Sequence, residues 1–159
     1  MPSALSNAAG YKQPISALVV IYTHDLDVLL LERADFPDHW QSVTGSRDGD
    51  ESLMDTAIRE AREETGLDAH HYRLTDWQLQ NTYDIYHQWI HRYPPGTTHN
   101  TEHVFGLELP GRQPVKLSPR EHLSHIWLPW REATDKVFSP SNRAAILQLP
   151  ERMQCHPQN

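Results

Sequence analysis

A dense group of acidic side chains between residues 45 and 67 carries the clearest chemical signal in this sequence. Glu60, Glu63 and Glu64 would fall within about one turn of a helix, because each helical residue advances by ~100°. As bare carboxylates, Glu60 and Glu64 would repel each other by a few tenths of a kcal/mol. A divalent cation bound by oxygen ligands would turn this repulsion into attraction. The spacing is compatible with a metal site, but on spacing alone a solvated acidic face, on which Arg59 pairs with Glu63, is the more common outcome.

A strand–loop–helix unit is predicted to hold these carboxylates. Residues 40–44 are predicted as a short strand that runs into Gly45, followed by an acidic loop and a helix that ends at Gly66. Asp50 or Ser52 can cap the start of this helix. One face of the helix is apolar and is expected to pack on a core, through Leu53, Met54, Ala57, Ile58 and Ala61.

Apolar and β-branched runs elsewhere predict the rest of an α/β fold. The predicted strands cover residues 16–22, 28–31, 73–80, 82–91 and 102–109. Residues 118–125 are predicted as a loop before another short strand, and 139–149 as a helix that starts with Ser139 and Pro140. We expect one domain over residues 11–149, with flexible termini at 1–10 and 150–159.

Composition limits the classes of partner. The chain has 159 residues and a net charge of −7, which argues against a protein that relies on non-specific contacts with a nucleic-acid backbone. Cys155 is the only cysteine, so no internal disulfide can form and a reducing, cytoplasmic location is expected. Neither a signal peptide nor a stretch long enough to span a membrane is evident, so no membrane association is expected.

The acidic stretch resembles the Nudix box, GX5EX7REUXEEXGU, at every fixed position. Those positions are Gly45, Glu51, Arg59, Glu60, Glu63, Glu64 and Gly66, with Ala61 and Leu67 at the apolar places. The resemblance implies the Nudix fold, an α/β/α sandwich around a mixed β-sheet. It also implies hydrolysis of a nucleoside diphosphate linked to another group. Mg²⁺ is the expected cofactor, with Mn²⁺ as an alternative.

The same resemblance assigns roles to individual residues. The metal ligands would be Glu60, Glu64, Glu121 and the carbonyl oxygen of Gly45. The catalytic carboxylates would be Glu63, Glu64 and Glu121, with Glu63 acting as a further ligand or sharing the role of general base. Glu51 and Arg59 would form an internal ion pair that braces the loop on the helix. Glu121 is included because many family members take one more glutamate from outside the motif.

The likeness extends beyond the motif, into segments such as YKQPISALVVIY, WQSVTGS and HRYPPGTTHNTEH. These resemble the branch of the family that acts on 7,8-dihydroneopterin 3′-triphosphate in folate biosynthesis, releasing pyrophosphate and leaving the monophosphate. The implied substrate contacts are Lys12, Arg33, Thr44, Tyr83, Asp84, Ile85, Tyr86 and Ser141. A small polyphosphate is thus the expected partner, and the oligomeric state is left open.

Two other functions stay open at this point. One is a broader Nudix pyrophosphohydrolase for nucleoside triphosphates, 8-oxo-dGTP included, or dinucleoside polyphosphates. The other is a non-catalytic Nudix module that only senses a nucleotide, although such a module would be expected to have lost glutamates that this chain retains.

Overall fold

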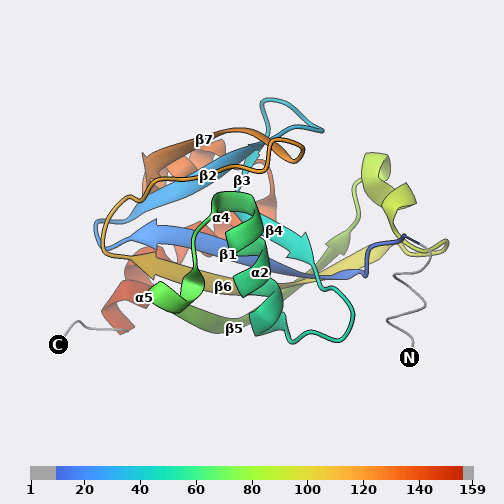
Figure 1. Ribbon diagram of the computed structural model, residues 1–159, viewed down its shortest axis with the longest axis horizontal. Helices are drawn as coiled ribbons and strands as arrows, with labels where there is room; N and C mark the ends of the chain where they lie inside the picture. The colour runs from blue at the N-terminus through green and yellow to red at the C-terminus, as the bar shows by residue number, and fades with distance from the viewer. Residues whose placement is uncertain (1–9, 156–159) are drawn as a thin grey trace.

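A mixed β-sheet between two helical layers forms the protein in the computed structural model, which describes residues 10–155 (Figure 1). The strands are β1 (Ile15–Thr23), β2 (Asp27–Arg33), β3 (Trp40–Gln41), β4 (Val43–Ser46), β5 (Arg73–Asp84), β6 (His99–Leu109) and β7 (His122–Pro129). The α-helices are α2 (Leu53–Thr65), α3 (Trp130–Lys136), α4 (Pro140–Leu147) and α5 (Leu149–Cys155), and the 3₁₀ helices are η1 (Ala69–His71) and η2 (His87–Arg92).

The central strand β1 is buried on both faces, which explains its continuous apolar sequence. Its alternate residues Ala17, Val19 and Ile21 pack toward α2, in one hydrophobic cluster. The intervening Leu18, Val20 and Tyr22 belong to a second cluster with residues of α3, α4 and α5. In Figure 1, α2 lies in front of the sheet and the C-terminal helices lie behind it. The predicted α/β/α sandwich is therefore confirmed.

The two edges of β1 are used differently, and this difference opens the sheet. One edge pairs with parallel β6 along its whole length, from Ile15↔Thr101 to Thr23↔Leu109. The other edge is shared, because antiparallel β4 pairs with residues 16–19 whereas β2 pairs at Tyr22↔Val28. Beyond that point β2 turns to β3 and β7. The sheet thus divides into two arms, and residues of both arms line one cleft.

Two predicted strands differ from the structure. The strand expected over residues 40–44 is two short strands, because the backbone N–H of Ser42 donates to Asn142 Oδ1 (2.8 Å) rather than to a neighbouring strand. The strand expected over residues 82–91 is wrong beyond Asp84, since residues 87–92 form η2. In that segment Tyr86 and Trp89 both contact Phe138, so their side chains turn to the same neighbour instead of alternating.

The C-terminal half also holds more regular structure than predicted. β7 begins at His122, within the segment predicted as a loop, because it pairs with β2 as far as Arg33. Helix α3 was not predicted; it is short, and no side chain caps its start. The tail predicted after residue 149 is helical to Cys155 as α5, anchored by the buried Leu149. Residues 1–9 and 156–159 of the predicted termini lie outside the described part of the chain.

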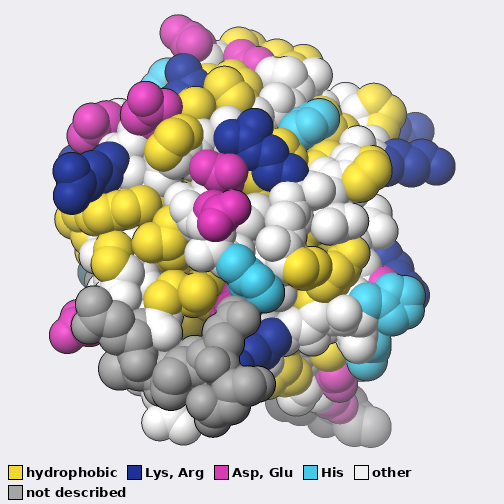
Figure 2. All heavy atoms as spheres, turned by 90° about the vertical axis from the view of Figure 1, so that its left-hand side faces the viewer, with side chains coloured by type: hydrophobic (Ala, Val, Ile, Leu, Met, Phe, Trp, Pro, Cys, Tyr) yellow, Lys and Arg dark blue, Asp and Glu magenta, His cyan; other side chains and the backbone are white. Residues whose placement is uncertain are grey.

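The end of the molecule on the left of Figure 1 is turned to the viewer in Figure 2. On this face, basic and acidic side chains of the described residues are interspersed rather than gathered into one block of a single sign. Among the helices that the structure describes, none is both long enough and apolar enough to cross a membrane.

Candidate active site

The helix that carries the acidic residues begins and ends as the sequence predicted. At its start, Ser52 Oγ accepts a hydrogen bond from the backbone N–H of Asp55 (3.1 Å). At its end, Gly66 adopts a left-handed conformation with φ of 78°, and its N–H donates to the carbonyl of Arg62 (2.8 Å). The helix is therefore fixed at both ends, which sets the positions of the carboxylates between them.

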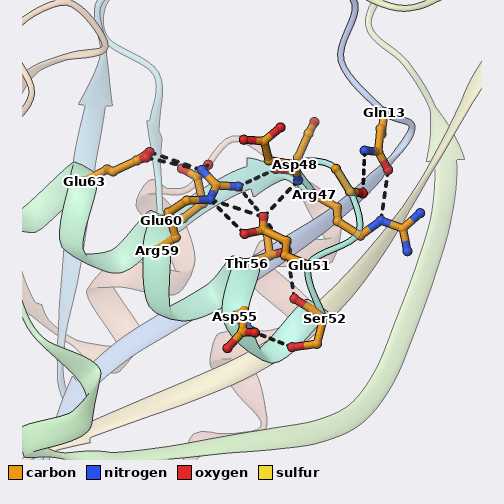
Figure 3. A network of polar contacts seen from close by, with 12 residues as sticks. Gln13, Arg47, Asp48, Glu51, Ser52, Asp55, Thr56, Arg59, Glu60 and Glu63 are labelled. Atoms are coloured by element: carbon orange, nitrogen blue, oxygen red, sulfur yellow. Dashed lines mark hydrogen bonds and ion pairs between the residues drawn. The ribbon is translucent and has the colours of Figure 1, made fainter. Parts of the chain in front are cut away.

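Arg59 is the centre of a polar network that joins the loop to the helix (Figure 3). The predicted ion pair is present, with Arg59 Nη2 2.6 Å from Glu51 Oε1. Nη2 also donates to the carbonyl of Ser46 (3.0 Å), while Nη1 donates to Glu60 Oε1 (2.7 Å) and Glu63 Oε1 (3.1 Å). One guanidinium group thus holds the loop residue and two of the helix carboxylates in fixed relative positions.

Gly45 lies directly against Glu60. A Cβ atom at Gly45 would overlap the carboxylate group of Glu60, so any other residue at this position would have to displace that side chain. The absence of a side chain lets strand β4 approach α2 closely enough for the Gly45 backbone and the Glu60 carboxylate to line the same cleft.

Glu64 is the most deeply buried of the acidic residues, with 1% of its surface exposed. Burial, then a hydrogen bond to Glu60 and the charges of Glu60 and Glu121, raise the pKa of Glu64 well above its ordinary value. Burial likewise raises the pKa of Glu60. Two adjacent carboxyl groups are thus held where their ionised forms are costly without a compensating positive charge.

His122 lies beside Glu64 but does not supply that charge. Its Nε2 atom is 3.5 Å from Glu64 Oε1, and that oxygen has no hydrogen-bond partner within the described residues. Burial, followed by the charge of Arg33, lowers the pKa of His122 to about 4, so the imidazole is neutral near pH 7. An unpaired oxygen of a buried carboxylate therefore faces this part of the cleft.

These residues suit a hard divalent cation better than a softer one. No group of three or more histidine, cysteine, aspartate or glutamate side chains among the described residues is already arranged as a complete metal cage. The donors present are carboxylate and carbonyl oxygens, including the unpaired Oε1 of Glu64. Mg²⁺ commonly binds through one or two carboxylates, with water and substrate phosphates completing its shell. An incomplete set of oxygen donors fits that behaviour.

Another part of the cleft lining, the basic wall, carries positive charge from Lys12, Arg33 and Arg92. Arg33 donates from Nε and Nη2 to the two carboxylate oxygens of Asp35, both at 2.7 Å, and Arg92 Nη2 lies 2.9 Å from Asp35 Oδ2. The guanidinium of Arg33 also stacks on Trp89, 4.1 Å from the ring centroid. Burial, then the charges of Arg92 and Arg33, lower the pKa of Lys12. Three basic side chains share this wall with one acidic residue, which favours an anionic ligand.

The cleft has a volume of about 610 Å³ and brings together most of the predicted site. Its lining includes Lys12, Arg33, Thr44, Gly45, Glu60, Glu63, Glu64, Tyr83, Ile85, Tyr86 and Glu121. Two predicted substrate contacts lie elsewhere. The Asp84 side chain is 86% exposed and pairs with His99 (2.8 Å). Ser141 stands outside the lining and donates a hydrogen bond to Glu102, which does line the cleft.

Several residues of the cleft were not predicted from the sequence, namely Asp35, Trp89, Arg92, Asn100, Glu102 and His122. Trp89 was predicted to lie in a strand and Arg92 in a loop. Nothing in the sequence indicated that Arg92 pairs with the distant Asp35. The pattern of His99–Leu109 held one available signal: Asn100 and Glu102 occupy the same face as Val104, where an apolar residue would be expected.

A sequence model of the NUDIX domain matches residues 12–149. The chain belongs to the Nudix family. It is 44% identical over 142 residues to a dihydroneopterin triphosphate diphosphatase of Escherichia coli K12, which covers 87% of this chain and 93% of the relative. It is 40% identical over 139 residues to the Haemophilus influenzae protein of the same name, covering 86% of this chain and 87% of the relative.

Comparison with a solved structure also shows the Nudix fold for this protein. The E. coli dihydroneopterin triphosphate pyrophosphohydrolase superposes with a TM-score of 0.82 at 44% identity, over 87% of this chain and 95% of that one. The Nudix fold predicted from the acidic motif is therefore confirmed. Nudix hydrolases generally use a divalent metal, which agrees with the oxygen donors described above.

Proposed function

We propose that this Nudix protein is a cytoplasmic enzyme that hydrolyses 7,8-dihydroneopterin 3′-triphosphate to the monophosphate and pyrophosphate, with Mg²⁺ as cofactor, in folate biosynthesis. The observation that carries the proposal is the 44% identity to the E. coli diphosphatase over 142 residues, 93% of that relative. Such a match extends far beyond the 23 residues of the acidic motif, and so beyond what the family shares as a whole.

The residues that would hold the cation are Glu60, Glu64, Glu121 and the carbonyl oxygen of Gly45. Glu121 precedes β7 and is near enough to Glu64 to raise the pKa of that carboxyl group. When bound, a divalent cation neutralises phosphate charge and makes an attacking water easier to deprotonate. The unpaired Oε1 of Glu64 supports its assignment as a ligand.

The basic wall would hold the triphosphate. Arg33 and Lys12 would bind phosphate oxygens, and the guanidinium of Arg33 is already oriented by Asp35 and Trp89. Water then attacks a phosphorus atom and its proton passes to one of the carboxylates Glu63, Glu64 or Glu121. The bond between the attacked phosphorus and the oxygen that bridges the α and β phosphates breaks, and the departing phosphate group takes the electron pair, which gives pyrophosphate and the monophosphate.

Three aromatic side chains in the lining of the cleft suit a flat heterocycle. Tyr86, Trp89 and Phe138 all line it, with ring centroids 5.2 Å apart for the first pair and 5.8 Å for Tyr86 and Phe138. Such rings offer faces on which a pterin can stack. The cleft volume of about 610 Å³ lies in the usual range for small-molecule sites.

Incubation of the protein with the pterin triphosphate and Mg²⁺ tests the proposal. The expected products are equal amounts of pyrophosphate and monophosphate, measured by chromatography and a pyrophosphate-specific assay. Stepwise release of orthophosphate would contradict it. A panel that includes dATP, 8-oxo-dGTP and a dinucleoside tetraphosphate provides the comparison. A several-hundredfold preference for one of these over the pterin would instead support the broader nucleotide hydrolase, and no turnover of any would support a binding module.

A further inference from the structure

A buried polar group lies in the cleft outside the metal site and the basic wall. It consists of Asn100 and Glu102 on β6 and of Tyr83 on the adjacent strand β5, all of which line the cleft. Glu102 is 4% exposed and Asn100 is 2% exposed. Both stand in register with neighbouring strands, at Asn81↔Glu102 and Tyr83↔Asn100, so the backbone holds them rigidly. Groups of this kind are costly to bury unless they have hydrogen-bond partners.

The protein satisfies this group only in part. Ser141 and Asn81 donate side-chain hydrogen bonds to the Glu102 carboxylate, yet Glu102 Oε1 has no hydrogen-bond partner among the described residues. Asn100 Nδ2 donates to Ser16 Oγ (2.8 Å) and Tyr83 Oη (3.0 Å), which fixes its amide, while Oδ1 likewise has no partner in the described part of the chain. Two acceptor atoms, two residues apart on one face of β6, are therefore buried without a donor from residues 10–155.

Buried acceptors without protein donors predict a ligand that brings donors. A pterin carries two adjacent donors on one edge, the ring N3–H and the exocyclic 2-amino group, in the geometry that a carboxylate accepts. We propose that Glu102 binds this 2-amino-pyrimidinone edge of the substrate, with Asn100 accepting a further hydrogen bond, and so determines which heterocycle the enzyme accepts. The inference rests on the proposed function and adds to it a specificity-determining residue. Ser141 then acts through Glu102, as a residue that positions it.

This arrangement selects by hydrogen-bond pattern. Guanine presents the same pair of donors, N1–H and the 2-amino group, whereas adenine presents a donor beside the lone pair of N1. An ionised carboxylate accepts from the first pattern and is repelled by the lone pair in the second. Burial raises the pKa of Glu102, and two ligand N–H donors would favour its charged form. A site that hydrogen-bonds its ligand strongly disfavours analogues that lack the matching groups.

The variant Glu102→Gln tests the inference, because it keeps the side-chain shape and replaces one acceptor oxygen by a donor NH₂ group. We expect kcat/KM for the pterin triphosphate and for dGTP to fall by about 10- to 100-fold, the loss typical of a hydrogen bond to a charged group. For dATP, kcat/KM should hold or rise, since an amide can pair with adenine. A purely structural role would lower all three values together.

A second readout needs neither metal nor turnover. The dissociation constant of 7,8-dihydroneopterin, which lacks phosphates, is measured by calorimetry without metal, and Glu102→Gln should weaken it by about 10-fold or more. Glu108→Gln is the matched control: Glu108 lies on the same strand, is 6% exposed and contacts His24 (3.1 Å) away from the cleft. This control should leave the pterin, dGTP and dATP values in their wild-type ratio.

The outcomes separate this inference from the proposed function. If the wild-type enzyme cleaves the pterin triphosphate and Glu102→Gln lowers all substrates equally or none, the inference is overturned and the function stands. If the wild-type enzyme does not cleave it, the proposed function fails. The effect of Glu102→Gln on the ratio of kcat/KM for dGTP to that for dATP still decides whether Glu102 binds the 2-amino-pyrimidinone edge. If Glu102→Gln does not fold, Glu102→Asp takes its place, because the shorter side chain moves the two acceptor oxygens away from the ligand by one methylene. This variant should weaken dihydroneopterin binding, and unchanged binding would overturn the inference.

Discussion

The two walls of the cleft hold their charges in opposite ways. On the α2 wall, the half-buried Glu60 and the buried Glu64 are adjacent and held with raised pKa values. On the basic wall, Asp35 lies between Arg33 and Arg92; burial opposes its ionisation, but hydrogen bonds and charge from these arginines lower its pKa to about 2. The basic wall is thus internally compensated, whereas on the acidic wall Arg59 pairs with Glu60 and Glu63 and the described residues leave Glu64 without a positively charged partner. The acidic wall should therefore respond strongly to a bound cation, and the basic wall should be organised before any ligand arrives.

The largest effect should come from the centre of the acidic wall. Glu64→Gln removes a proposed metal ligand and keeps the side-chain shape. Loss of a residue that only supports a ligand typically costs ~10- to 100-fold, so loss of the ligand itself should lower kcat/KM by at least ~100-fold. Steady-state kinetics with Mg²⁺ measure the loss, and circular dichroism verifies the fold. Retention of more than a tenth of the wild-type activity would remove Glu64 from the metal site.

Two glycine substitutions separate the site from the fold. Gly45→Ala pushes a methyl group into the Glu60 carboxylate, and Gly106→Ala pushes one into the Trp77 ring on the far cluster. Both should lower the free energy of unfolding by about 1–3 kcal/mol, measured in urea. Only Gly45→Ala should also weaken the activation by Mg²⁺, by roughly 10-fold or more. Equal Mg²⁺ activation in the two variants would show that the close approach of Gly45 serves packing alone.

The missing charge on the acidic wall should also appear in metal-free stability. Above the ordinary glutamate pKa of 4.5, the unfolded chain has lost a proton that folded Glu64 still holds. Its contribution is therefore complete below pH 4.5 and is lost as pH rises through the raised folded value. With a chelator present, the Tm of the wild-type protein should fall relative to Glu64→Gln between pH 5 and 9. His122 contacts Glu64, but its folded-state pKa of about 4 lies below this pH range, and its titration in the unfolded chain is common to both proteins.

Restoring the charge completes this test. Added Mg²⁺ at high pH should raise the Tm of the wild-type protein more than that of Glu64→Gln, because a ligand that binds only the folded state stabilises it. If the difference in Tm between the two proteins does not change with pH or on addition of Mg²⁺, the Glu60–Glu64 pair does not provide the cation site.

The smallest effect belongs to the compensated wall. Asp35→Asn leaves Arg33 and Arg92 without their shared carboxylate. The pKa of Asp35 is about 2 against an ordinary 3.8, so its contribution is present above pH 3.8 and lost as pH falls through about 2. Allowing for solvent screening, the variant should lose about 1 kcal/mol at pH 7 and little at pH 2, measured by urea unfolding. Asp84→Asn, on an exposed ion pair, is the control and should show no measurable change.

Local patterns in the sequence predicted one wall of the cleft well. The motif residues are close in sequence, so the spacing of one helix and its capping residues is enough to place Glu60 and Glu64 together. The network of Arg59 with Glu51 is equally local, spanning eight residues. The buried strands β1 and β6 were also predicted closely, because their apolar composition reflects burial on both sides of the sheet.

The other parts of the cleft depend on contacts that sequence spacing does not encode. Asp35 meets Arg92 across 57 residues, and this contact follows from the turn of η2 toward the basic wall. Glu102 comes beside Ser16 through the parallel register of β1 and β6, and beside Ser141 through the packing of α4. Ser141, predicted as a substrate contact, lies outside the cleft lining and hydrogen-bonds to Glu102, and this contact was not predicted. Without the register, an isolated glutamate in a strand carries no indication of its neighbours.

Because the sheet divides at β1, the path of the backbone itself forms the binding cleft. The gap arises where β2 and β4 diverge along one edge of β1. It does not depend on small side chains that leave room in a packed region. Substitutions of lining residues should then change the shape of the cleft without closing it. Substrate preference can therefore change with the lining residues, while the carboxylates of Glu60 and Glu63 on α2 keep their positions through local hydrogen bonds to Arg59.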